Sequence, residues 1–280
     1  MQSVKTVQDV RSQSKEWKKQ GLSVGLVPTM GYLHAGHASL IRRARAENDR
    51  VVVSIFCNPM QFGPAEDLAS YPRDLAHDSA LCQELGADLI FHPEPSAMYD
   101  AAFCSFVDMN ILPATLCGKS RPVHFRGVCT VVAKLLNIVQ PDNAYFGQKD
   151  AQQLAIIRRM VADLNIDVAI HGCPIVREHD GLAMSSRNTY LSDEERQAAL
   201  VLSQAVQLGQ ALFAQGETRA ANLLEPMRKH IESQPLARID YLQAVDGLTM
   251  QPISHVCAPA LVAMAVYIGK TRLLDNFIIQ

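Results

Sequence analysis

The chain has 280 residues, of which 48% are hydrophobic and 19% are charged, a balance typical of a globular protein with a large core. Its 26 Lys and Arg residues nearly balance 28 Asp and Glu residues, so no overall charge favours nucleic acid or a membrane surface as a partner. No apolar stretch is long enough to span a bilayer, and the N-terminal residues lack the apolar core of a secretory signal. The seven cysteines are scattered singly without a Cys-x-x-Cys pair, so we expect reduced thiols, mostly in the core, and a cytoplasmic protein.

Strand-like and helix-like segments alternate along the first 172 residues. Apolar, β-branched runs predict strands at 22–27, 51–56, 88–93, 144–147 and 168–172. Helical spacing of apolar residues predicts helices at 36–48, 74–86, 127–142 and 150–165, with Gly86 and Pro141 ending two of them. This order predicts an α/β fold with a Rossmann-like parallel sheet and helices on both faces.

The pattern changes near residue 176. Ser192 to Glu195 form a capping box that opens a long helix reaching about Gln215. Two strand-like runs, 237–245 and 261–269, follow close together. We therefore expect two domains, a Rossmann-like one at 1–175 and a smaller α+β one at 176–280.

The first predicted strand leads into Pro-Thr-Met-Gly-Tyr-Leu-His-Ala-Gly-His, residues 28–37. A strand followed by a tight turn and a helix N-terminus forms an anion site, because free backbone N–H groups and the helix dipole face outward there. Gly36 lets a ligand approach the backbone, and His34 and His37, one helical turn apart, can both donate to a phosphate. We do not interpret the pair as a metal site, since no third ligand lies nearby.

Ligands of parallel sheets bind beyond the carboxyl ends of the strands. The segments 57–63 and 147–150, which also follow predicted strands, are therefore further candidates for the site. A later segment, 181–188, reads Gly-Leu-Ala-Met-Ser-Ser-Arg-Asn. Its two hydroxyls and guanidinium are suited to phosphate oxygens.

These motifs together carry a resemblance. His-x-Gly-His with a later Met-Ser-Ser-Arg resembles the paired signatures of the nucleotidyltransferase superfamily, which includes class I aminoacyl-tRNA synthetases. Longer strings at 28–37, 58–74, 121–128, 146–154 and 180–188 resemble, in this order, the pantothenate synthetase family. That family condenses (R)-pantoate with β-alanine at the expense of ATP, through pantoyl adenylate, and releases AMP and pyrophosphate. The resemblance implies a carbon–nitrogen bond-forming ligase of the coenzyme A pathway, a homodimer that uses Mg²⁺, with a second domain that closes over ATP.

The resemblance also implies roles for particular residues. Catalysis falls to His34, His37 and Lys149, which would stabilise departing pyrophosphate. Pantoate would bind to Gln61 and Gln153, whose neutral amides orient a carboxylate while leaving its charge reactive. ATP would be bound by Met30, Gly31, Tyr32, Leu33, His34, Ala35, Gly36, His37, Gly147, Gln148, Lys149, Asp150, Val176, Met184, Ser185, Ser186 and Arg187.

Two positions depart from the family pattern. Cys117 stands where some members have Glu, and we interpret it as a small buried residue rather than a thiol activated by Lys119 and Arg121. His77 replaces an acidic neighbour of Asp78, so we assign no metal ligands.

Two rival functions share the first motif. A nucleotidyltransferase would leave its nucleotide on the product, and a nucleotide sensor would not turn ATP over. Free AMP together with an amide product would exclude both.

Overall fold

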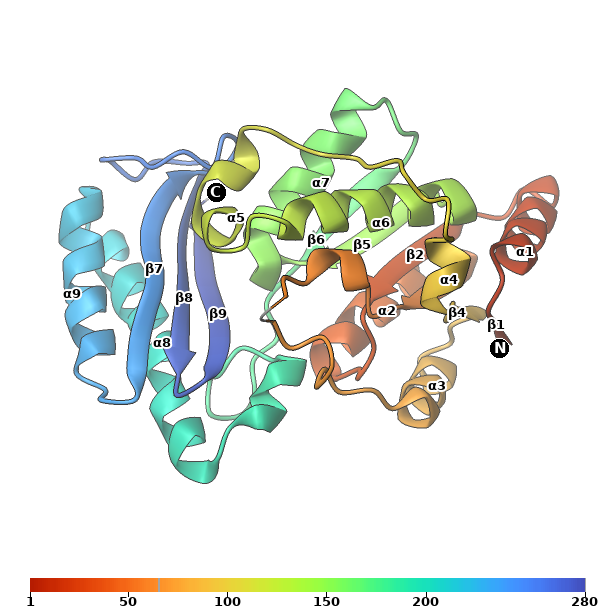
Figure 1. The fold of residues 1–280 in the computed structure, drawn as a ribbon. Helices are drawn as coiled ribbons and strands as arrows, with labels where there is room; N and C mark the ends of the chain where they lie inside the picture. Colours follow the sequence, from red (N-terminus) through yellow and green to blue (C-terminus); the bar gives the residue numbers. More distant parts are fainter. Residues whose placement is uncertain (65, 280) are drawn as a thin grey trace. The chain divides into compact units, whose positions relative to one another are not determined.

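The computed structural model describes residues 1–64 and 66–279, and the chain divides into two compact units (Figure 1). Unit 1 comprises Met1–Met109, Val123–Gln148 and Ile156–Pro174. Unit 2 comprises Asn110–Pro122, Lys149–Ala155 and Ile175–Gln280. Unit 2 therefore includes two short segments from the part of the sequence that precedes residue 176.

Unit 1 is built on a six-stranded sheet in the order β1-β4-β3-β2-β5-β6, and every paired neighbour is parallel. The strands are β1 (Gln2–Val4), β2 (Val24–Thr29), β3 (Arg50–Ile55), β4 (Leu89–Phe91), β5 (Asn143–Gly147) and β6 (Ala169–Cys173). The predicted parallel α/β architecture is thus confirmed.

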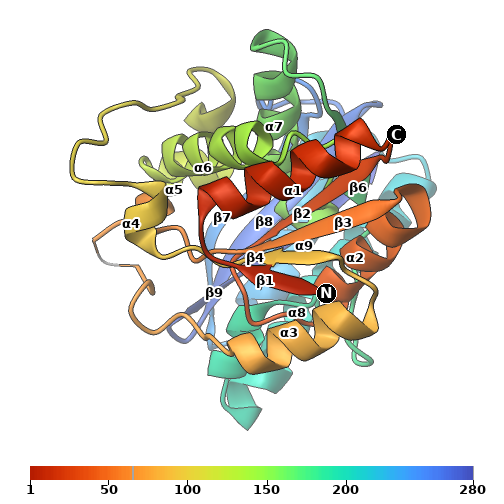
Figure 2. The same cartoon turned by 90° about the vertical axis from the view of Figure 1, so that its right-hand side faces the viewer.

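Helices cover both faces of this sheet, as predicted. Figure 2 shows α1 (Val7–Lys19) and α6 (His124–Val139) on one face and α2 (Ala35–Glu47) and α3 (Leu75–Glu84) on the other. Successive strand residues point to opposite faces, so Val51 and Val53 join Leu40 and Ile41 of α2 in one core. This packing fixes the helix that begins with the two histidines.

Further elements lie in the first half and the middle of the chain, some in unit 1 and some in unit 2. They are η1 (Pro59–Gln61), α4 (Pro95–Met98), η2 (Leu112–Ala114), α5 (Leu116–Ser120), η3 (Gln148–Asp150) and α7 (Ala151–Asp163). In the described part of the chain, no helix is both long enough and apolar enough to cross a membrane.

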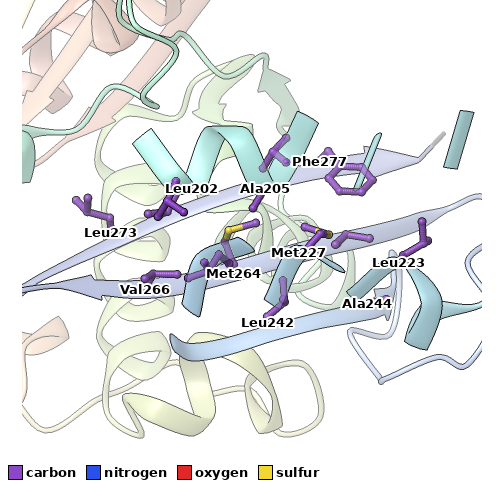
Figure 3. Close-up of a cluster of buried hydrophobic side chains, with 14 of the residues drawn as sticks. Leu202, Ala205, Leu223, Met227, Leu242, Ala244, Met264, Val266, Leu273 and Phe277 are labelled. Carbon is purple, nitrogen blue, oxygen red and sulfur yellow. The ribbon is translucent and has the colours of Figure 1, made fainter. Parts of the chain in front are cut away.

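Unit 2 contains a three-stranded antiparallel sheet in the order β7-β8-β9. Its elements are η4 (Ser186–Tyr190), α8 (Asp193–Ala214), α9 (Ala220–Glu232), β7 (Ala237–Asp246), β8 (Ala260–Ile268) and β9 (Thr271–Ile279). Helices α8 and α9 bury their apolar sides against the sheet, where Met227, Met264 and Phe277 meet (Figure 3). The predicted capping box is present, because Ser192 Oγ accepts from the Glu195 amide and the Glu195 carboxylate accepts from the Ser192 amide.

All seven cysteines are free thiols. Four are buried as expected, whereas Cys104 and Cys257 are exposed, so the core interpretation is wrong for those two. Burial raises the pKa of Cys82, with a further contribution from the Asp78 carboxylate, and that of Cys129, each to about 12. Both thiols therefore stay protonated at neutral pH.

Candidate active site

The loop between β2 and α2 brings the two predicted histidines to the carboxyl edge of the sheet. Gly31 and Tyr32 have φ of +90° and +51°, so the chain turns sharply directly after the strand. His34 then has extended backbone and forms the N-cap of α2. The predicted order of strand, tight turn and helix N-terminus is confirmed.

Hydrogen bonds from the backbone determine which ring nitrogen carries the proton in His34 and in His37. The Gly36 amide donates to His34 Nδ1 at 3.1 Å, and the His34 amide donates to His37 Nδ1 at 3.3 Å. An amide N–H can only donate, so each Nδ1 carries a lone pair and each neutral ring carries its proton on Nε2. The ring centroids are 4.1 Å apart. The pair therefore supplies two neighbouring N–H donors at a helix N-terminus, an arrangement suited to an anionic group.

The same loop is held by a buried carboxylate, that of Asp78. Asp78 lies in the first turn of α3 and is 1% exposed. Its Oδ2 accepts from the Tyr32 amide at 2.8 Å, and its Oδ1 accepts from the Leu33 amide at 2.7 Å. Sequence alone gives no sign of this contact, because the partners are backbone groups 45 and 46 residues away.

Gln61 lies in the η1 turn that follows β3, the strand paired with β2. Asn58 Oδ1 accepts from Tyr99 Oη at 2.8 Å and from the Met60 amide at 3.3 Å. Asn58 Nδ2 therefore faces Gln61 and donates to Gln61 Oε1 at 3.1 Å. With its carbonyl engaged there, Gln61 presents the donor end of its amide, Nε2, which lies 3.0 Å from Met30 Sδ. Asn58 is a second contributor that the sequence analysis did not assign.

The segment after β5 contains the second group of predicted ATP ligands. Gly147 and Gln148 are the last two residues of a unit 1 segment. Lys149 and Asp150, which lie in the η3 turn, are the first two residues of a unit 2 segment. Within unit 2, Asn276 Nδ2 donates to the Lys149 carbonyl at 2.9 Å, which fixes the backbone at the predicted catalytic lysine.

Gln153 lies in the first turn of α7 and its residue is half-buried. Its neighbour Gln152 is 5% exposed and anchors the turn, because its amide nitrogen donates to the Leu112 and Thr115 carbonyls and its oxygen accepts from the Cys117 amide. Gln152 is therefore structural.

The third predicted group lies on a hairpin in unit 2. The Met184 amide donates to the Val176 carbonyl at 3.0 Å, and Arg177 and Ala183 form an antiparallel bridge. The Val176 carbonyl therefore closes this hairpin. Ser185 Oγ caps the η4 turn by accepting from the Arg187 amide at 3.2 Å. Its neighbour Ser186 is 6% exposed.

An ion pair anchors that hairpin to the unit 2 sheet. The Arg177 guanidinium binds the Asp275 carboxylate through two hydrogen bonds, at 2.7 and 2.9 Å. Asp275 is 2% exposed, so the carboxylate of this bidentate pair is removed from water, whereas the Arg177 side chain is 30% exposed. On the outer side, the Arg196 guanidinium lies 2.8 Å from Glu178 and 2.6 Å from Asp180.

Cys117 is buried, as predicted, and is 7% exposed. Its Sγ lies 3.2 Å from Tyr241 Oη and 3.6 Å from each terminal nitrogen of Arg272. Burial and then the Cys117 sulfur raise the pKa of Tyr241. Arg272 is in turn paired with Asp240 at 2.7 Å. The cysteine therefore belongs to a closed polar cluster within unit 2.

A parallel sheet whose carboxyl edge carries two imidazole donors at a helix N-terminus is typical of α/β enzymes that bind nucleotides. The family model described as Pantoate-beta-alanine ligase matches residues 2–278. The chain belongs to the pantoate–β-alanine ligase family. It is thus a ligase that forms a carbon–nitrogen bond between pantoate and β-alanine.

Individual relatives agree along the whole chain. A pantothenate synthetase from Ruminiclostridium cellulolyticum is 63% identical over 277 residues, which cover 99% of this chain and 98% of that protein. The crystal structure of pantothenate synthetase from Thermus thermophilus is 46% identical, with a TM-score of 0.94 and 99% of each chain covered. Pantoate-beta-alanine ligase from Francisella tularensis, crystallised with beta-gamma ATP and beta-alanine, is 33% identical, with a TM-score of 0.81 and coverage of 99% and 97%.

Proposed function

We propose that this chain condenses pantoate with β-alanine in two ATP-dependent steps. In the first, the pantoate carboxylate attacks the α-phosphorus of ATP, a P–O bond breaks, and pyrophosphate leaves with pantoyl adenylate as the product. In the second, the β-alanine amine attacks the acyl carbon, AMP leaves, and the amine loses a proton as the amide of pantothenate forms. The pair of Nε2–H donors on His34 and His37 is the observation that carries this proposal.

The ATP ligands that we propose are those that the family resemblance implies. In unit 1 these are the predicted loop residues Met30 to His37, with Gly147 and Gln148 after β5. In unit 2 they are Lys149, Asp150, Val176 and the segment Met184 to Arg187. The support for this assignment is that the unit 1 segments follow β2 and β5, which are hydrogen-bonded neighbours, at the same edge of the sheet.

The histidines and Lys149 are the catalytic residues. Negative charge on the β-phosphate grows as the P–O bond to the α-phosphorus breaks, so donors placed beforehand stabilise the transition state more than the ground state. Their Nδ1 atoms are held by backbone amides, which fixes both rings before ATP arrives. Lys149 adds a positive charge on a backbone that Asn276 holds.

Pantoate is bound by Gln61 and Gln153. The Gln61 amide group presents its nitrogen because Asn58 occupies its oxygen, and an N–H donor is what a carboxylate or a hydroxyl oxygen requires. A neutral amide orients the acid without pairing its charge, whereas an arginine would stabilise the carboxylate before it attacks.

Mg²⁺ enters this site with ATP. The ion typically keeps several waters and binds substrate phosphates rather than an all-protein cage. Within residues 1–64 and 66–279, no group of three or more His, Cys, Asp and Glu side chains is arranged to hold a metal ion, which favours this mode. The protein is further proposed to act as a cytoplasmic homodimer, as the family resemblance implies.

Isotope exchange tests the adenylate step. Labelled pyrophosphate should enter ATP when pantoate is present and β-alanine is absent, because the first step is then reversible by itself. Replacing Gln61 by Ala should depress this exchange strongly, since loss of orientation can cost several kcal/mol of barrier. ATP binding, measured separately by calorimetry, should change little in that variant. Exchange that requires β-alanine would overturn the two-step route.

A further inference from the structure

The structure assigns Asp78 as a positioning residue for the condensation reaction: its carboxylate holds the turn between β2 and α2 in the conformation that directs His34 and His37 toward the ligand. Both carboxylate oxygens accept backbone amides of that turn, at 2.7 and 2.8 Å, and the side chain is 1% exposed. The inference rests on the proposed role of the two histidines. Asp78 acts through the backbone and touches no substrate.

The turn requires such an anchor because of its backbone conformation. Tyr32 has a φ of +51°, in the left-handed region that residues with a side chain rarely adopt. It follows Gly31, whose φ is +90°. Successive amides in such a turn point to the same side and form a concave donor pair suited to an anion. The Asp78 carboxylate fills this role at Tyr32 and Leu33, so the strained turn and the carboxylate depend on each other.

The groups around the Asp78 side chain favour its negative charge and leave room for it. Asp78 lies in the first turn of α3, where the helix dipole stabilises negative charge. The exposed ring of His77 approaches Asp78 Oδ1 with its Nδ1 at 3.3 Å. Gly31 leaves room for the contact, because a Cβ at that position would lie 3.2 Å from Asp78 Oδ2 and 3.2 Å from Ile55 Cγ2.

The link from this anchor to the catalytic groups is short. Leu33, whose amide binds Asp78 Oδ1, directly precedes His34, the N-cap of α2. The amide of His34 is itself the donor to His37 Nδ1. A rotation of the peptide at Leu33 therefore displaces the N-cap and the hydrogen bonds that orient both rings.

Two matched substitutions separate positioning from general stability. Asp78→Asn replaces one acceptor oxygen by an NH₂ group, which must then face a backbone N–H. Asp142→Asn is the control, because Asp142 Oδ2 also accepts a backbone amide, that of Val24 at 2.7 Å, at the opposite end of β2. We expect Asp78→Asn to lower kcat roughly 10- to 100-fold, the effect of one lost buried hydrogen bond on the active conformation. Asp142 is exposed and asparagine keeps one acceptor oxygen for the Val24 amide, so Asp142→Asn should leave kcat within about twofold.

A spectroscopic readout follows the rings directly. Nitrogen-15 NMR of the histidine-labelled protein should show Nε2–H tautomers with acceptor Nδ1 atoms at His34 and His37. Asp78→Asn should shift both rings toward a mixture of tautomers, and Asp142→Asn should not. In the unaltered protein, the amides of Tyr32 and Leu33 should exchange slowly with deuterium, a measurement that stands even if Asp78→Asn fails to fold.

The outcomes are distinct. Rapid exchange of both amides, or normal kcat with unchanged ring signals in Asp78→Asn, would overturn the positioning role. Equal losses of kcat in the Asp78 and Asp142 variants would also overturn it, since stability alone would then explain both. Altered ring signals with normal kcat would uphold the positioning of the rings and instead refute the proposed function of the histidines.

Discussion

His34 has one role that the structure shows and a second that we propose, and two substitutions distinguish them. Its Nδ1 caps α2 by accepting the Gly36 amide at 3.1 Å, and its Nε2–H is the proposed donor to the departing pyrophosphate. His34→Ala removes both. Loss of one preorganised donor costs about 2.7–4 kcal/mol of transition-state stabilisation, or roughly a 10²–10³-fold drop in kcat. Loss of the cap costs about 1 kcal/mol of folding stability, or a Tm lower by about 2–4 °C.

His34→Asn retains only the cap, because asparagine is among the preferred N-cap residues but lacks a donor at the Nε2 position. We expect its Tm to return close to that of the unaltered protein while kcat stays low. The assay is steady-state pyrophosphate release with saturating pantoate, β-alanine and ATP, paired with thermal unfolding. If His34→Asn recovers kcat along with Tm, the histidine acts only as a cap and the charge-stabilising argument fails.

Two further substitutions test the packing and the charge network. Gly127→Ala should destabilise the protein by about 1–3 kcal/mol or more in urea unfolding, because the new Cβ would lie 2.3 Å from the Met60 carbonyl oxygen. Gly63→Ala is the control and should not destabilise it, because a Cβ at Gly63 would lie 3.8 Å from its nearest neighbour. The hydrogen bond from Arg196 holds the pKa of Glu178 below its ordinary value of 4.5. The contribution of this ion pair to folding stability is therefore present above about pH 4.5 and is lost as the pH falls through the folded-state pKa. Glu178→Gln should therefore lower Tm at pH 7 and have little effect at pH 3; an equal loss at both would contradict the ion-pair account.

The central strands could be predicted from sequence because their apolar runs are strong and each is followed by a turn. The boundaries were less accurate. The strand predicted at 22–27 is Val24–Thr29, since Pro28 and Thr29 remain in register with β3 although proline usually ends a strand. Helix α6 ends at Val139 as Gln140 turns left-handed before Pro141.

Other elements gave too weak a signal to predict. Helix α1 was not predicted: it buries only Val10, Ser14 and Trp17, and one of these three is polar, so few apolar residues mark its buried side. Strand β1 has three residues and gains its place only by pairing with β4, far away in the chain. Strands β7 and β8 were predicted, but β9 was not; it extends the sheet by pairing with β8.

The residues of the candidate site also divide into those that could be found from the sequence and those that could not. His34 and His37 could be found because His-x-Gly-His follows a predicted strand, and their partners are local backbone groups within three residues. Asp78 and Asn58 could not, because their roles depend on tertiary contacts with amides and carbonyls that leave no pattern in the sequence. Asp78 was considered only as a metal ligand, whereas its two oxygens accept from the loop.

A common rule governs the polar groups at the carboxyl edge of the unit 1 sheet. The acceptor nitrogens of His34 and His37 are occupied by backbone amides, and the acceptor oxygen of Gln61 is occupied by Asn58. In the proposed site, each of these side chains contributes an N–H donor, and none needs a formal charge to do so. Such an edge favours carboxylate and phosphate oxygens through neutral donors and a helix dipole. A cationic edge would hold the same anions, but it would also lower the nucleophilicity of the carboxylate that has to attack.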